Sequence, residues 1–385
     1  MNKTVLNNCT LLDGTAQMQP QPGMTIVLDG QNIETVSSVC PELSEKNDFH
    51  LMGHYVLPGL INLKSCLASS PVRRLGGSGL RCARTRLKCS GAARATMMSG
   101  VTTAATFDNG GAEALVRDWI NIANVDGPRI LSGGVSILPP GAGGDLFAPA
   151  SPEQARACID QLSSLQPAFV RVIAAREGAR MPADVLQACC QAAQALGARV
   201  IVYADETDSV RAALRCGAAA VEHGARMDDE TAALYHETGA ALLVSLSGLV
   251  AQKAKTAAAL DIAVACAKDA VSRGIPVGLG SGAGESGCAH YDMWREIYWF
   301  SKLTGVSCAQ ALHAATAVNA SIAGLASQAG QIAPGLCADL FVTDRNPLED
   351  LAALREPTLL FVRGVVTTPR QSKNRQSEIK LDKLL

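Results

Sequence analysis

Hydrophobic positions in the middle of the chain follow two alternating patterns. Short apolar runs predict strands at 100–106, 129–133, 169–173, 198–203, 219–223, 241–245 and 276–280. Ala-rich amphipathic stretches between them predict helices, as at 152–165, 182–196 and 256–273. This alternation indicates parallel βαβ units, and about eight strands over roughly 270 residues predict a (β/α)8 TIM-like barrel in the α/β class. A doubly wound open sheet is the alternative, but no Gly-x-Gly-x-x-Gly motif opens a helix after the first strand.

Both ends of the chain carry patterns typical of short strands and turns. Strand-like runs occupy 4–6, 23–30 and 55–57, then 340–344 and 359–366 near the other end. The dipeptides Asp13-Gly14 and Asp29-Gly30 favour tight turns. Two terminal β-segments enclosing a long middle predict a small β-sandwich built from residues 1–56 and 330–385. The barrel would then span residues 57–329.

Composition narrows the functional classes. The chain has 385 residues, 48% of them hydrophobic and 18% charged, which is typical of a globular protein with a large core. The formal net charge of -1 gives no general attraction to nucleic acid or acidic membranes. We see no signal-peptide pattern and no apolar run long enough to cross a membrane. The 13 cysteines lack a Cys-x-x-Cys pair and an even framework, which favours reduced thiols and a cytoplasmic protein.

Several motifs resemble one family in the right order along nearly the whole chain. The run Tyr-Val-Leu-Pro-Gly-Leu-Ile-Asn-Leu-Lys-Ser-Cys-Leu at 55–67 resembles the first-strand signature of the amidohydrolase superfamily, roughly V-L-P-G-L-I-D-x-H-x-H. Other matching motifs lie at 99–103, 126–131, 221–224, 312–320, 330–340 and 346–348. The most similar branch contains imidazolonepropionase-like and Xaa-Pro-type enzymes. The resemblance implies a barrel, metal-dependent hydrolysis of non-peptide or dipeptide C–N bonds, and a homo-oligomer.

The metal ligands of that family are mostly replaced here. The resemblance implies two histidines after strand 1, a carboxylated lysine or Glu after strand 4, histidines after strands 5 and 6, and an aspartate after strand 8. Those positions hold Lys64, Cys66, Arg171, Tyr203, His223 and Gly282. Protonated lysine and arginine offer no lone pair to a cation. Cys66 and His223 could bind zinc, but a catalytic zinc usually takes three protein ligands, so we expect no metal cofactor.

The replacements also change the charge of the predicted barrel mouth. Lys64 and Arg171 could bind an anionic small molecule, with Tyr203, His223 and Ser281 completing a ligand site. The alternative is that both cations pair with Asp205 and Glu222 as a structural plug.

Cys66 could also act as a nucleophile, because nearby cations favour its thiolate, with His223 or Tyr203 moving protons. The alternative is that Cys66 is a small buried side chain that fills the space of a histidine.

Three functions remain open from the sequence. The chain could be a catalytically inactive or altered barrel that binds a small ligand or a partner. It could be an active C–N bond hydrolase with an unusual mononuclear zinc site or metal-free chemistry. It could also be an assembly subunit of an active relative.

Overall fold

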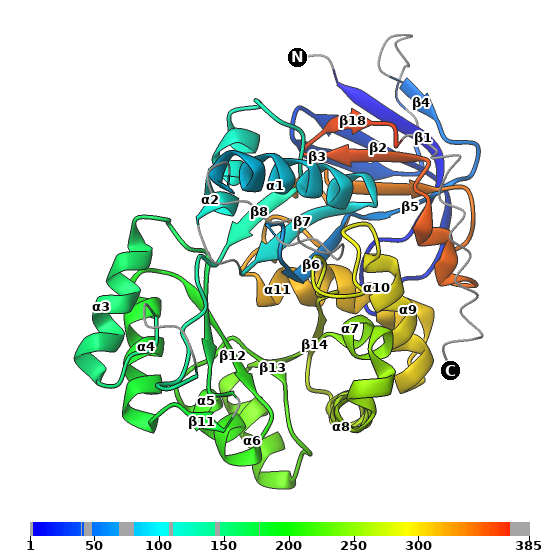
Figure 1. The fold of residues 1–385 in the computed structure, drawn as a ribbon. Coiled ribbons are helices and arrows are strands. Elements are labelled where there is room, and N and C mark those ends of the chain that lie inside the picture. Colours follow the sequence, from blue (N-terminus) through cyan, green and yellow to red (C-terminus); the bar gives the residue numbers. More distant parts are fainter. Residues whose placement is uncertain are drawn as a thin grey trace.

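The computed structural model describes residues 3–39, 41, 48–68, 81–107, 111–142, 147–176 and 178–369, without the side chains of 81–84 and 253–255. Within these residues the fold is mixed α/β, with parallel strands in the middle of the chain and a sheet made by both ends (Figure 1). The predicted alternation of strands and helices is confirmed at all seven apolar runs in the middle of the chain.

The parallel strands form two sheets. One has the order β6-β7-β8, and the other has the order β15-β14-β13-β12-β9. Their bounds are β6 (Leu60–Ser65), β7 (Val101–Thr106), β8 (Arg129–Ser132), β9 (Phe169–Ile173), β12 (Arg199–Ala204), β13 (Ala220–His223), β14 (Ala241–Val244) and β15 (Val277–Leu279). Single parallel bridges join the two sheets at both edges, between Ile137 and Val172 and between Ser65 and Ala283.

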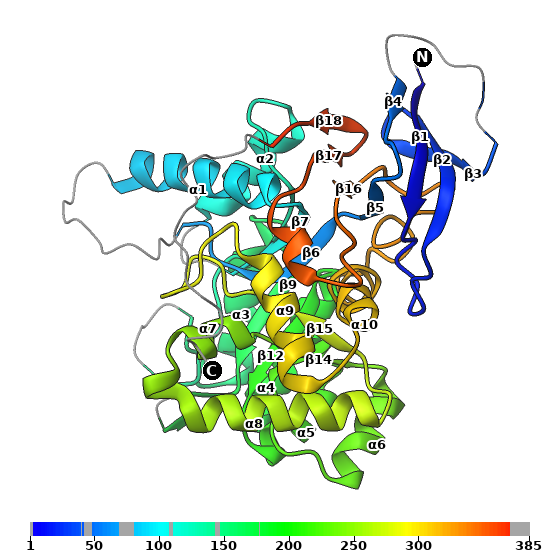
Figure 2. The same cartoon turned by 90° about the vertical axis from the view of Figure 1, so that its right-hand side faces the viewer.

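Helices follow most of these strands and pack on their outer sides, as α8 does along β14 and β15 (Figure 2). Their bounds are α1 (Arg81–Met98), α2 (Ala112–Asn121), α3 (Pro152–Ser163), α4 (Ala183–Ala195), α5 (Thr207–Arg215), α6 (Asp229–Thr238), α7 (Leu246–Ala251), α8 (Lys253–Ser272), α9 (Met293–Thr304), α10 (Cys308–His313) and α11 (Asn319–Ile322). A π-helical turn (Ala314–Val318), a 3₁₀ turn (Leu351–Arg355) and the two-residue strands β10 (Ala175–Arg176) and β11 (Ala179–Arg180) complete this part.

Both ends of the chain contribute to one eight-stranded sheet. Its order is β18-β17-β16-β5-β1-β2-β3, and β4 pairs with β1. The bounds are β1 (Thr4–Leu11), β2 (Gln21–Asp29), β3 (Asn32–Ser37), β4 (Asp48–His50), β5 (Tyr55–Pro58), β16 (Leu340–Thr343), β17 (Leu359–Val362) and β18 (Val365–Thr367). The pairing of the two termini is as predicted, while the division into a sandwich domain and a barrel domain stays a prediction.

The run at 359–366 differs from the single strand that the apolar pattern predicts. It breaks into β17 and β18, which pair antiparallel around Arg363 and Gly364. Both turn residues have positive φ, 51° and 77°, as a two-residue hairpin with the right twist requires. A side chain at Gly364 would collide with the Gly30 carbonyl oxygen, so this hairpin also packs against the turn between β2 and β3.

The terminal sheet packs closely on the parallel strands. Gly100, just before β7, has φ 93°, and a Cβ there would lie 2.1 Å from the Phe341 ring. Phe341 belongs to β16 and is fully buried. Gly59, between β5 and β6, faces Thr102 of β7 equally closely. The chain thus enters the first parallel strand directly from the terminal sheet, which fixes where β6 and Lys64 lie.

Candidate functional site: a buried ion-pair network

Strand alternation places three functional side chains on one face of the larger parallel sheet. Every second residue of a strand faces the same side, so Arg171 follows Phe169, and Tyr203 follows Ile201. Phe169 and Ile201 are fully buried in the inner apolar cluster, while Arg171 and Tyr203 are the next residues toward the carboxyl ends of their strands. The β12–β13 register sets Glu222 opposite Tyr203. The polar groups therefore end the inner core at the mouth of the parallel sheets.

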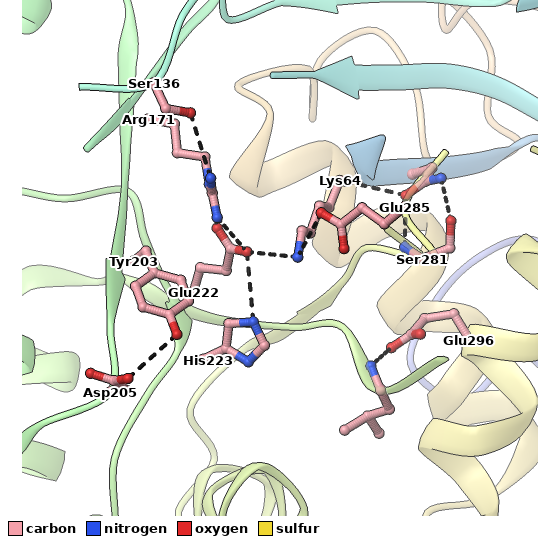
Figure 3. A network of polar contacts seen from close by, with 12 residues as sticks. Lys64, Ser136, Arg171, Tyr203, Asp205, Glu222, His223, Ser281, Glu285 and Glu296 are labelled. Atoms are coloured by element: carbon pink, nitrogen blue, oxygen red, sulfur yellow. Dashed lines mark hydrogen bonds and ion pairs between the residues drawn. The ribbon is translucent and has the colours of Figure 1, made fainter. Parts of the chain in front are cut away.

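Glu222 is the centre of the network (Figure 3). Arg171 binds it through two hydrogen bonds, Nε to Oε2 at 2.6 Å and Nη2 to Oε1 at 2.9 Å. The Lys64 Nζ lies 3.0 Å from the same Oε1. Only 1% of the Glu222 side chain is exposed. Burial opposes its ionisation, but Arg171 and Lys64 outweigh burial and hold the pKa of Glu222 well below its usual range.

Lys64 comes from β6, where the pairing with β7 is irregular between Asn62 and Ser65. Its ammonium also lies 3.3 Å from the Glu285 Oε1. Burial opposes the charge on Lys64, but the Glu222 and Glu285 carboxylates raise its pKa above the ordinary value. The network therefore joins two basic side chains, Lys64 and Arg171, to two acidic ones, Glu222 and Glu285.

His223 is the last residue of β13 and has φ 72°. This left-handed backbone conformation is uncommon for residues other than glycine. Its Nε2 lies 3.8 Å from the Glu222 Oε1, and its ring packs 5.1 Å from the Tyr203 ring. Burial first, then the Lys64 cation, lowers the pKa of His223 to about 4. The imidazole is therefore neutral at pH 7 and keeps a nitrogen lone pair.

The neutral His223, whose side chain is 19% exposed, predicts a pH effect on stability. Its folded-state pKa is about 4 and its ordinary value is 6.5, so the unfolded chain binds a proton first as pH falls from 6.5 to 4. Asparagine tolerates the positive φ and does not titrate, so His223→Asn keeps the backbone and removes this effect. Between pH 7 and pH 4, we expect wild type to lose about 3 kcal/mol of unfolding free energy relative to His223→Asn.

Guanidinium denaturation at both pH values measures this difference, and His236→Asn serves as the matched control because His236 lies on the exposed side of α6. A constant difference between wild type and His223→Asn across this range contradicts a buried neutral imidazole.

The prediction about Asp205 is wrong in part. Glu222 does pair with both cations, but Asp205 accepts a hydrogen bond from the Tyr203 hydroxyl at 3.4 Å instead. Glu285 takes the second anionic place because it can reach Lys64 from the loop after β15. The Arg171 guanidinium also lies 5.8 Å from the Tyr203 ring and 5.9 Å from the Phe107 ring, so aromatic faces cover it on two sides.

The loop after β15 is held against β6 by backbone hydrogen bonds. The Gly282 N–H donates to the Lys64 carbonyl, and the Cys66 N–H donates to the Ala283 carbonyl. Ser281 is buried and accepts a hydrogen bond from the Asn62 amide at 2.8 Å. Ser281 therefore helps to hold this loop against β6, and its place in a ligand site stays a prediction. Cys66 is partly exposed at the end of β6.

Gly282 leaves the space that Glu285 uses. Gly282 has φ 65°, and a Cβ there would lie 2.9 Å from the Glu285 Oε2. A carboxylate from three residues further along the chain thus occupies the place where a side chain at 282 would extend. The sequence indicates this carboxylate only by the single acidic residue of the glycine-rich stretch 278–287, which matches no family motif.

Glu296 is a second buried carboxylate that the sequence reasoning missed. It lies on α9 and accepts the backbone N–H groups of Leu246 and Ser247, both at 2.7 Å, at the start of α7. Burial raises the pKa of Glu296 to about 7, against the two backbone donors and Lys64, which lower it. Its role is to hold α7 beside the mouth of the parallel sheets.

A cavity of about 550 Å³ adjoins the Arg171 side of the network. Arg171 and Tyr203 form its inner wall, and Asp205, Glu206, Arg176 and Arg180 contribute its charged groups. The third nitrogen of Arg171, Nη1, has only a 3.5 Å contact with the Ser136 hydroxyl among the hydrogen bonds of the described residues. The cavity therefore places a guanidinium donor and a phenol beside a space large enough for a small molecule.

The donors at this site do not fit a catalytic divalent metal. Two of the six candidate positions, Lys64 and Arg171, carry protonated groups that repel a cation, and Gly282 has no donor. Across the residues described, no group of three or more His, Cys, Asp or Glu side chains could hold a metal ion. Glu222 is fully engaged by the two cations.

Comparisons with known proteins agree with this fold. The family model described as "Amidohydrolase family" matches residues 55–367. A putative prolidase from Bifidobacterium longum is 29% identical, with a TM-score of 0.85 over 95% of this chain and 94% of that one. A Xaa-Pro dipeptidase with bound methionine is 22% identical, with a TM-score of 0.85 over 95% of this chain and 100% of that one.

Ochratoxinase of Aspergillus niger gives a shorter sequence match. It is 28% identical over 162 residues, which make up 38% of this chain and 33% of ochratoxinase. Its structure has a TM-score of 0.81 and covers 95% of this chain and 96% of that chain, at 19% identity. The sequence match thus spans a third of that relative, while the structural likeness concerns the fold.

Among the helices of the described ranges, none is both long and apolar enough to pass through a bilayer.

Proposed function

Because the chain belongs to the amidohydrolase family, we propose that it is a member in which a buried ion-pair network has replaced the catalytic metals and which binds a small anionic molecule at the same mouth. One observation supports the proposal: Glu222 lies between Lys64 and Arg171. In this proposal the two protein cations take the place of bound metal ions. In this proposal the two parallel sheets act as one closed (β/α)8 barrel, and both termini form a separate small sandwich.

The anionic character of the ligand follows from the cavity. Its described lining carries three arginines and two acids, and Arg171 is the innermost cation. Arginine binds carboxylates and phosphates through planar, paired donors, and aromatic faces hold its plane in position. The Tyr203 hydroxyl lies on the same wall, where it donates to Asp205 and keeps its oxygen lone pairs. A small carboxylate or phosphate ester fits this arrangement better than a neutral or cationic molecule.

Two other functions remain as outcomes of the test. An active C–N bond hydrolase would need a metal at His223 and Cys66 or chemistry without metal. The similarity to the Bifidobacterium longum prolidase is the reason to keep this alternative. An assembly subunit would instead co-purify with an active relative. The expectations of a homo-oligomer and of a cytoplasmic location stay predictions.

Metal analysis of untagged protein tests the proposal directly. After incubation with Zn²⁺ or Mn²⁺ and desalting, we expect less than roughly 0.2 metal ion per chain. The reason is that the site offers fewer than the three protein ligands that a catalytic zinc usually takes. We also expect no hydrolysis of Xaa-Pro dipeptides or N-acyl amino acids under the same conditions. A small phosphorylated or dicarboxylate molecule should raise the thermal midpoint of wild type but not of Arg180→Gln, in which an exposed cavity cation is removed.

One or more tightly held metal ions per chain, lost in His223→Asn or Cys66→Ser, contradicts the proposal and supports the hydrolase. If the protein is free of metal and none of these anions changes its thermal midpoint, the proposed ligand binding is contradicted. The assembly subunit is then the remaining function.

A further inference from the structure

The ion-pair network has one member that reaches solvent. The side chains of Glu222, Lys64 and Arg171 are 1%, 11% and 17% exposed, whereas that of Glu285 is 47% exposed. Glu285 therefore closes the network from the outside. Within the described chain, Lys64 is its ion-pair partner, at 3.3 Å.

Lys64 depends on Glu285 for its charge balance. Its other carboxylate, Glu222, already accepts two hydrogen bonds from Arg171, so one negative charge is shared by two cations. The second negative charge comes from Glu285. A group that displaces Glu285 should itself be an anion, because a neutral group would leave Lys64 and Arg171 with the single charge of Glu222 between them.

Glu285 can leave Lys64 without moving the backbone. The loop is fixed to β6 by the hydrogen bonds from Gly282 N–H to Lys64 and from Cys66 N–H to Ala283. A turn hydrogen bond from Glu285 N–H to Gly282 also holds the start of its own segment. Rotation about the side-chain bonds alone would carry the half-exposed carboxylate into solvent. An ion pair with such an exposed partner is weak, so exchange is inexpensive.

We propose that Lys64 is a carboxylate-binding site and that Glu285 is an internal stand-in for the ligand carboxylate, which binds by displacing it. This inference rests on the metal-free, ligand-binding function proposed above and names a second anion subsite, on the side of Glu222 away from the Arg171 cavity. His223 lies 3.8 Å from the Glu222 oxygen that Lys64 also contacts, so it belongs to the same group of side chains.

The proposal makes Glu285 a competitor for its own site. If the Glu285 carboxylate occupies Lys64 most of the time, only a small fraction of the protein has Lys64 available. The apparent affinity for an added carboxylate is the intrinsic affinity multiplied by that fraction. Glu285→Ala removes the competitor and leaves the loop backbone in place. We expect acetate and formate to bind Glu285→Ala with a dissociation constant roughly tenfold below that of wild type.

The experiment measures thermal midpoints and titration heats for wild type and Glu285→Ala with sodium acetate, formate and sulfate at equal ionic strength. Acetate and formate should stabilise Glu285→Ala far more than wild type, and sulfate should not reproduce the effect. Glu230→Ala is the matched control, because Glu230 is an acid that pairs with two arginines and is 56% exposed. It should respond as wild type does. Adding Lys64→Met to Glu285→Ala should abolish the acetate response.

Equal acetate responses in wild type, Glu285→Ala and Glu230→Ala overturn the inference, as does an equal response to sulfate. If Glu285→Ala does not fold, Glu285→Gln keeps the side-chain volume, and the same acetate comparison decides. Metal content separates the two proposals: metal-free protein without acetate binding defeats the Lys64 subsite alone, and metal-bound protein defeats the proposed function.

Discussion

Glu222→Gln is expected to lower the free energy of unfolding by about 3–5 kcal/mol, because it leaves two buried cations without their shared anion. Glutamine keeps the size of the side chain but has no charge, and its amide nitrogen cannot accept from Lys64 or Arg171. Lys64 is 11% exposed and Arg171 is 17% exposed, so water replaces little of the lost interaction. Guanidinium or urea unfolding at pH 7.5 measures the loss.

An exposed acid that also pairs with two basic side chains provides the control for Glu222. Glu230 pairs with Arg211 at 3.0 Å and Arg215 at 3.2 Å, but its side chain is 56% exposed. Glu230→Gln should cost less than about 1 kcal/mol. Adding Lys64→Met to Glu222→Gln should recover part of the loss, since it removes one uncompensated charge. Equal losses for Glu222→Gln and Glu230→Gln contradict a buried network in solution.

Glu222 also predicts the direction of a pH effect. Its folded-state pKa is lowered below the ordinary carboxylate pKa. Its contribution to the free energy of unfolding is therefore present above the ordinary pKa and is lost as pH falls through the folded-state pKa. The cost of Glu222→Gln should therefore shrink in acid.

Glu296→Ala is expected to cost a similar amount, about 3–5 kcal/mol at pH 5, for a different reason. It leaves the Leu246 and Ser247 N–H groups without their 2.7 Å acceptors in a buried place and opens a void under α7. Each unsatisfied buried donor costs about 1–3 kcal/mol, and the void adds to this. Glu296→Gln keeps the volume and one acceptor, so its loss should be smaller.

The pH dependence of Glu296 has the opposite sign to that of Glu222. Burial raises its folded-state pKa to about 7 from 4.5, so its contribution is greatest in acid and is lost as pH rises through 7. The difference between wild type and Glu296→Ala should therefore fall by about 2.5 kcal/mol between pH 5 and pH 8. Unfolding free energies at the two pH values measure it. A difference that grows with pH shows that the two backbone donors, and not burial, dominate this carboxyl.

Local patterns were enough to predict the elements that carry the site. The apolar runs at 169–173 and 198–203 match β9 and β12 because parallel strands covered on both faces are continuous apolar runs in the sequence. The alternation of side chains along a strand then places Arg171 on the face of Phe169 and Tyr203 on the face of Ile201. The run at 359–366 was harder because the break at Arg363-Gly364 depends on a hairpin whose turn fits the β2–β3 turn in space.

The candidate site was predictable in its chemical groups and less so in its partners. Lys64, Arg171 and His223 were identified by position, and Glu222 was named with Asp205 as a partner for the two cations. Asp205 seemed equally available from the sequence, but it bonds to Tyr203. Glu285 was missed, because only the missing side chain at Gly282 and the contact of the loop with β6 bring it to Lys64.

The sequence by itself determined the alternation of strands and helices, the amidohydrolase family and the presence of Lys64 and Arg171 at positions where the resemblance implies metal ligands. These follow from local periodicity and from residue identities, which no folding step alters. Only the tertiary structure decided that Glu222 and Glu285 neutralise the new cations and that His223 stays uncharged. Ionisation depends on burial and on charges a few ångströms away, and the fold draws those charges from strands and loops far apart in the chain.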